Sequence, residues 1–161
     1  MRRVLYVFFG MFFIGGFDFV LADKIDSDIL IKNQWECEMT HEDKEIGSVI
    51  KIQTIDKYIR NNTTNSIGTI KIKFPQIEDE IIYSMSSISS WELDSEYMIS
   101  TLQTIKIKNI SHPEFDEFLN MEELFPENLS TSAKIVKLDN EELILQEEAT
   151  DMKVFCRATK K

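Results

Sequence analysis

The chain has 161 residues, a formal net charge of −10 and 43% hydrophobic residues, a size and composition that suit one domain around one core. The negative charge argues against nucleic acid and anionic membrane surfaces as partners, because both are bound through clustered Lys and Arg. An acidic surface keeps a protein soluble and is compatible with a basic protein partner.

Residues 1–22 have the features of a secretory signal peptide. Residues 1–3 form a short basic segment, and an uncharged, Phe-rich stretch over 4–17 follows. As a helix this stretch would span about 21 Å, well short of a hydrocarbon core of about 30 Å. Val20-Leu21-Ala22 places small or slim residues at the −3 and −1 positions of a cleavage site. We therefore expect cleavage after Ala22, no stable membrane anchor, and a mature domain over 23–161 in the periplasm or secreted.

Cys37 and Cys156 are the cysteines of the chain. In an oxidising compartment such a pair is most simply one disulfide. Polar and apolar residues alternate over 34–39 and again over 152–158, which places both cysteines on the inward faces of terminal strands. The disulfide would tie the first strand to the last strand or to its neighbour. In the chain-entropy model it would stabilise the domain by roughly 4–5 kcal/mol.

Period-two alternation, rich in Ile, predicts the strands between these ends. They are expected over 49–55, 67–74, 81–85 and 97–110, the last being long enough for one bent strand or two. Residues 57–60 either continue the first of these or start the next, and 61–65 form the clearest turn. Two later strands, 135–138 and 143–145, are expected to pair as a hairpin.

One helical passage is expected over 111–125. Ser111 followed by Glu114 is a capping-box pattern, and Pro113 is tolerated in a first turn. Apolar residues then recur at helical spacing, namely Phe115, Phe118, Leu119 and Leu124 or Phe125.

The predicted fold class is mainly β, with about eight antiparallel strands and one short helix. Consecutive short strands with matched terminal strands favour an up-and-down barrel or half-barrel. Closure would also remove the exposed edges of the Ile-rich strands. A β-sandwich is the alternative that the strand pattern leaves open.

Several segments carry a family resemblance. They are the Trp35-Glu36-Cys37 strand after a signal peptide, the segment 90–93, the helix before 135–138, the strand 142–146 and the closing segment 155–157. This layout resembles that of small secreted bacterial proteins with a lipocalin-like barrel, over most of residues 34–157. The resemblance implies a fold rather than an activity. Periplasmic lysozyme inhibitors are also small disulfide-closed barrels, but their Ser-Gly-x-x-Tyr loop has no counterpart here.

No set of residues predicts a catalytic, metal or cofactor site. His41 lies among carboxylates in 40–45, which is the composition of a hydrophilic turn, whereas metal ligands usually come from separate elements. His112 lies at the expected helix start, where a role in the cap is favoured. Acidic pairs in loops are typical of a solvated surface in so acidic a chain. They lie at 78–80, 122–123, 141–142 and 147–148.

The expected function is binding. Aromatic side chains are available to line a cavity, although small barrels are usually filled by their own side chains, so core packing is favoured. These are Trp35, Phe74, Tyr83, Trp91 and Tyr97. Asn-x-Ser/Thr sequons begin at Asn61, Asn62, Asn109 and Asn128.

We therefore expect an exported, non-enzymatic binding protein without a cofactor. Its partner would be a small apolar ligand inside the barrel or a basic protein at an acidic rim. The alternative is a periplasmic inhibitor or immunity protein of a basic envelope hydrolase. A hydrolase with no recognisable site is a third class.

Overall fold

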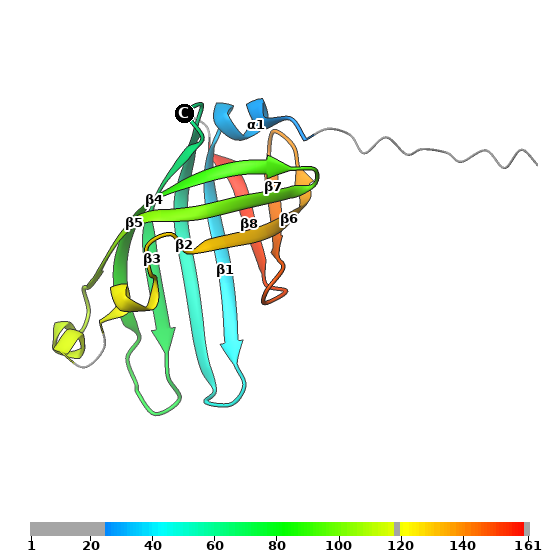
Figure 1. Cartoon of the computed structure of the whole chain (residues 1–161). Helices are drawn as coiled ribbons and strands as arrows, with labels where there is room; N and C mark the ends of the chain where they lie inside the picture. The colour runs from blue at the N-terminus through cyan, green and yellow to red at the C-terminus, as the bar shows by residue number, and fades with distance from the viewer. Residues whose placement is uncertain (1–24, 118–119, 160–161) are drawn as a thin grey trace, which may run out of the picture.

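The fold is a closed antiparallel β-barrel in which each strand pairs with the next and the last pairs with the first. The computed structural model describes residues 25–117 and 120–159, so the expected signal peptide lies outside the described residues. The strands, shown in Figure 1, are β1 (Gln34–Asp43), β2 (Ser48–Ile59), β3 (Thr63–Lys73), β4 (Ile81–Asp94), β5 (Tyr97–Asn109), β6 (Ser130–Leu138), β7 (Glu142–Glu147) and β8 (Lys153–Thr159). The predicted fold class is confirmed, and the sandwich alternative was wrong.

One end of the barrel is sealed by the short helix α1 (Ser27–Lys32), which lies over it in Figure 1. The Asp26 side chain caps this helix by accepting a hydrogen bond from the Asp28 backbone N–H at 2.9 Å. Leu30 is fully buried, and the Trp35 indole N–H donates to the Leu30 carbonyl at 3.1 Å. We call this the sealed end. Helix α1 was not predicted, since six residues are too few to show a helical period.

The opposite end is open, because β1 to β5 continue beyond their partners. β8 pairs with β1 only as far as Glu38, and β6 pairs with β5 only from Tyr97 to Thr101. The remainder of β1, up to Asp43, pairs with β2 alone. Figure 1 shows these long strands reaching past β6, β7 and β8. The molecule is therefore a closed barrel at the sealed end and a curved five-stranded sheet at this open end.

The connection from β5 to β6 differs from the expected α-helix. Residues 111–125 contain two 3-10 helices, η1 (Pro113–Glu117) and η2 (Met121–Leu124), while Phe118 and Leu119 lie outside the described residues. The Ser111 hydroxyl accepts a hydrogen bond from the Ile82 backbone N–H at 2.8 Å. This hydrogen bond to β4 takes the place of the capping box that was expected between Ser111 and Glu114. The segment is thus fastened to the sheet rather than wound into a regular helix.

Buried side chains form two separate cores. The core at the sealed end surrounds Leu30, Trp35, Trp91 and the two cysteines. Cys37 and Cys156 lie opposite each other on β1 and β8 and form a disulfide, with both residues buried. The core at the open end is built from Ile70, Ile72, Ile81, Tyr83 and Met121. Both follow from the strand alternation, because Ile, Tyr and Trp occupy inward positions toward the two ends of the long strands. Within residues 25–117 and 120–159, no helix has the length and apolar character to cross a membrane.

Candidate functional site

The inner face of the open end is apolar but incompletely covered. Ile50 and Ile52 on β2, Met85 on β4 and Ile107 on β5 pack against the open-end core, yet each stays partly exposed. Met121 of η2 covers part of this face and is buried there. Exposed apolar area on a concave inner surface is typical of a ligand site.

A layer of small polar side chains separates the two cores. By strand alternation, Asp56 on β2 faces the interior between Thr54 and the buried Tyr58. Its cross-strand partner is Ser66 on β3, and the partner of Ser66 is Ser87 on β4. Thr64 and Ser89 form the next row toward the sealed end. We call this set the polar belt. Its members are Thr54, Asp56, Thr64, Ser66, Ser87 and Ser89.

Asp56 is the charged member of the polar belt. Its Oδ1 atom is buried and has no hydrogen-bond partner in the described part of the chain. Burial raises the pKa of the Asp56 carboxyl, and hydrogen bonds from Ser66 and Thr54 offset only part of this effect. Thr64 Oγ1 is likewise buried and without a partner among the described residues. Buried polar atoms are nearly always hydrogen-bonded, so these two atoms can each accept a hydrogen bond from a bound molecule.

Tyr58 borders the polar belt on the side of the sealed end. Its ring lies edge-on to Trp91, with centroids 5.7 Å apart and planes at 84°. The Tyr58 hydroxyl donates to the Met98 sulfur at 3.5 Å. Burial, and secondarily the negative charge of Asp56, raises the pKa of Tyr58. The Tyr58 phenol therefore stays neutral and does not add a second negative charge beside Asp56.

The aromatic residues singled out in the sequence divide between the two cores. Trp35 and Trp91 are buried in the sealed-end core, and Tyr83 is buried in the open-end core. Phe74 packs against the open-end core and is partly buried, as is Tyr97 at the start of β5. The preference for core packing is therefore confirmed for the first three.

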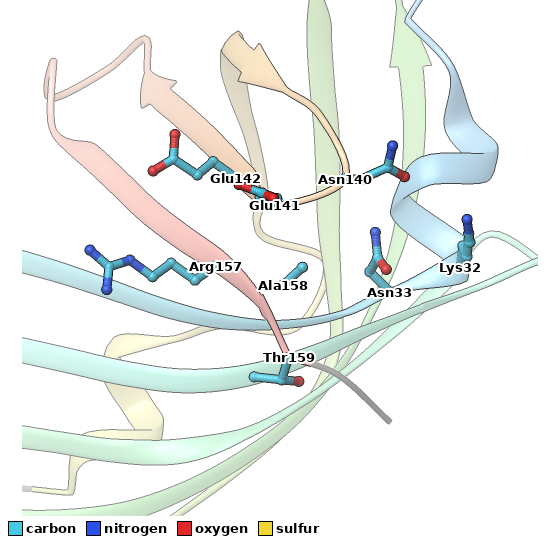
Figure 2. Close-up of a pocket in the computed structure, with 8 residues that line it drawn as sticks. All are labelled: Lys32, Asn33, Asn140, Glu141, Glu142, Arg157, Ala158 and Thr159. Atoms are coloured by element: carbon cyan, nitrogen blue, oxygen red, sulfur yellow. The ribbon is translucent and has the colours of Figure 1, made fainter.

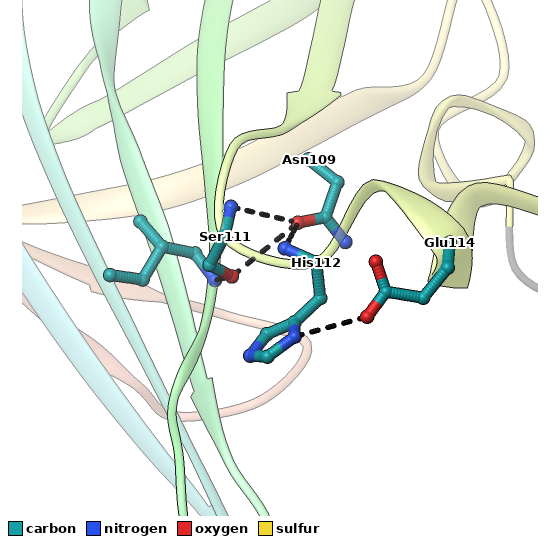
Figure 3. A network of polar contacts seen from close by, with 5 residues as sticks. Asn109, Ser111, His112 and Glu114 are labelled. Atoms are coloured by element: carbon teal, nitrogen blue, oxygen red, sulfur yellow. Dashed lines mark hydrogen bonds and ion pairs between the residues drawn. The ribbon is translucent and has the colours of Figure 1, made fainter.

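The two histidines do not meet. His41 lies near the end of β1 and is exposed, although the alternation places it on the inner face; this shows how open that edge is. His112 lies after β5, where its backbone N–H donates to Asn109 Oδ1 at 2.8 Å and its ring pairs with Glu114 at 3.2 Å, as Figure 3 shows. Asn109 is 1% exposed, so this sequon is inaccessible to a glycan in the folded protein. Among the described residues, no group of His, Cys, Asp and Glu side chains is arranged to hold a metal ion.

A polar hollow of about 490 Å³ lies at the sealed end, between α1, the β6–β7 turn and the end of β8. Figure 2 shows its lining, in which Lys32 and Arg157 are the basic side chains and Glu141 and Glu142 the acidic ones. Glu142 is paired with Lys137. The buried polar atoms without a hydrogen-bond partner in the described structure lie elsewhere. The side chains of this hollow therefore do not require a ligand to complete their hydrogen bonds.

The outer wall of the barrel also exposes apolar side chains. Ile55 on β2 lies opposite Ile67 on β3, and both line a shallow hollow of about 450 Å³, to whose lining Gly68 and Met85 also contribute. This hollow contains no buried polar atom without a partner. It serves below as the matched control surface for the inner face.

The polar belt was not among the predicted features, although the sequence contains a signal for it. In the strand around residues 50–58, the inward positions read Ile50, Ile52, Thr54, Asp56 and Tyr58. A carboxylate at an inward position of an otherwise apolar series departs from the usual rule that charged residues face solvent. The alternation that identified the strand could therefore also have identified Asp56. Comparison with models of protein families and with curated proteins finds no match for this chain.

Proposed function

We propose that this protein is a non-enzymatic binding protein that holds one small, mainly apolar ligand on the inner face of its barrel. The observation that carries the proposal is the partial exposure of inward-facing apolar side chains at the open end, above all Ile50 and Ile52. Exposing such side chains to water costs about 25 cal/mol for each Å² of apolar area, so an apolar ligand that covers them gains this amount.

The size of the barrel supports the proposal. An eight-stranded barrel has an interior that side chains just fill or that holds one small ligand. Here the layer between the cores is built from small side chains, with Ser66, Gly68 and Ser87 in adjacent strands. The consecutive strand order is also the one expected of a lipocalin-like barrel. These features favour a held ligand over a filled interior.

Access supports it as well. β1 beyond Glu38 and β5 beyond Thr101 lack a strand partner on one side, so the inner face is reached from the open end. We further propose that binding takes place outside the cytosol, after removal of residues 1–22. The buried disulfide is compatible with an oxidising compartment.

The test is titration of the protein with the neutral apolar fluorophore N-phenyl-1-naphthylamine. We expect saturable 1:1 binding that Ile52→Gln weakens at least fivefold and that Ile55→Gln leaves within twofold. These residues lie three apart on β2 and face opposite sides of the wall, which makes Ile55→Gln the matched control.

Ile50→Gln serves as a second inner-face variant if Ile52→Gln does not fold, because Ile50 lies two residues away on the same face of β2. Absence of saturable binding, or binding that depends on Ile55 and not on either inner-face residue, would overturn the proposal. Circular dichroism melts of each variant confirm that the barrel is folded at the assay temperature.

A further inference from the structure

The inner face contains one buried carboxyl group, that of Asp56, which pairs with no cation among the described residues. Asp56 has no ion pair among the described residues, and its buried Oδ1 has no hydrogen-bond donor. An ionised carboxylate only accepts hydrogen bonds, so this oxygen requires a donor. Leaving a buried charged group without one is among the costliest arrangements in a folded protein.

Among the described residues, the cross-strand neighbours of Asp56 carry no positive charge. Its neighbours across the sheet are Trp35 on β1 and Ser66 on β3. The lysines of β2 occupy the opposite phase of the alternation, where Lys51 pairs with Glu38 on the outer wall and Lys57 is exposed. On β2, Lys51 and Lys57 thus lie on the outer wall, whereas the Asp56 carboxyl group faces the interior.

We infer that the ligand of this site is a protonated amine with an apolar body, and that its ammonium group donates to Asp56. An ammonium supplies both the positive charge and the N–H donors that Asp56 lacks, with Thr64 Oγ1 available as a second acceptor. The apolar body would lie along Ile50 and Ile52 toward the open end. An alcohol of the same length satisfies the hydrogen bond but not the charge, and a carboxylate is repelled. The inference rests on the proposed function and adds the chemical class of the ligand.

The test uses three probes of equal chain length, octylamine, octan-1-ol and octanoate, each displacing N-phenyl-1-naphthylamine from the purified protein at pH 7. We expect octylamine to bind about tenfold more tightly than octan-1-ol, a difference of about 1.4 kcal/mol, because a hydrogen bond to a charged group is stronger than a neutral one by about this amount. Octanoate should bind most weakly.

The variant Asp56→Asn should abolish the preference for the amine while leaving the affinity for octan-1-ol within threefold. Glu36→Gln is the matched control, since it removes one negative charge from the neighbouring strand on the outer wall and should keep the preference. It also measures any general attraction of a cation to this acidic protein. Repeating the titrations at higher salt separates the two effects, because a buried pair is screened less than a surface charge.

Two outcomes separate the inference from the proposed function. Equal binding of amine and alcohol, or an amine preference that survives Asp56→Asn, would overturn the inference and leave the binding function standing. If the fluorophore itself does not bind, the proposed function fails, and the inference fails with it.

Discussion

Opening the disulfide between Cys37 and Cys156 should remove a large part of the stability of this barrel. The bond joins the first strand to the last and encloses a sequence separation of 119 residues. The two strands also pair through their backbones, from Gln34 to Glu38 on β1. That ladder exists only in the folded state, whereas the covalent bond also restricts the unfolded chain.

The size of the effect follows from the length of the closed loop. For 119 residues, the chain-entropy relation gives about 4.8 kcal/mol at 25 °C. A domain of this size is stabilised by about 5–15 kcal/mol in total. With an m-value of about 2 kcal/mol/M in urea, the midpoint of unfolding should fall by about 2.4 M. The reduced protein is therefore expected to be marginally stable.

The assay is urea unfolding followed by tryptophan fluorescence, for which buried Trp35 and Trp91 are natural reporters. It compares the oxidised protein, the same protein with a reductant, and the double variant Cys37→Ala/Cys156→Ala with and without reductant. The reductant should destabilise the wild type and leave the double variant unchanged. A loss below about 1 kcal/mol on reduction would refute the reasoning, since it would mean that the cross-link barely restricts the unfolded chain. Unfolded, unreduced protein should contain essentially no free thiol.

Three further changes have expected outcomes in stability assays. Asp56→Asn should stabilise the protein by about 1–3 kcal/mol at pH 7, because it removes a buried charge with a missing partner. The folded-state pKa of Asp56 is raised, so the wild type loses stability as the pH rises from the unfolded-state pKa of 3.8 to the folded-state pKa. In urea titrations below pH 3.8 the stability advantage of Asp56→Asn should therefore vanish. An equal gain in stability at acid pH would contradict this explanation. Gly68→Ala should cost about 1–3 kcal/mol in thermal melts, since the new Cβ would lie 2.0 Å from the Gln53 carbonyl oxygen, and a neutral result would show that β2 and β3 separate easily there. Trp35→Phe should cost about 1–3 kcal/mol and speed hydrogen exchange in α1, because the Leu30 carbonyl loses its buried donor; unchanged exchange would show that α1 is held without this bond.

The strands could be predicted because their pattern is written directly in the sequence. In β3, Ile70 and Ile72 face inward and are buried, while Lys71 and Lys73 alternate with them. A one-residue shift of register would expose the whole apolar set, so the pattern fixes the register once one face is buried. The pairing of β1 with β8 follows from the same reasoning applied at the two ends of the chain.

The helical parts could not be predicted, because tertiary contacts decide them. Residues 111–125 have a plausible cap and an apolar stripe, but Ser111 bonds to β4 and the Asn109 side chain takes the His112 backbone N–H. These ties arise from the sheet, which a local pattern does not contain. In α1 the reverse holds, since a short segment with no persuasive period is made helical by the fit of Leu30 into the barrel end.

Asp56 is expected to affect both stability and binding, and the two effects should have opposite signs. A buried carboxyl with one unpartnered oxygen lowers the stability of the empty protein, so its presence is explained if something gained elsewhere offsets that cost. A cationic ligand provides such a gain, because it supplies the missing charge and donor together. Asp56→Asn should therefore make the empty protein more stable and the amine complex weaker. If the variant were less stable as well as weaker in binding, Asp56 would be a structural residue of the interior, and the ligand site would have to be sought among Ile50, Ile52 and the other apolar residues alone.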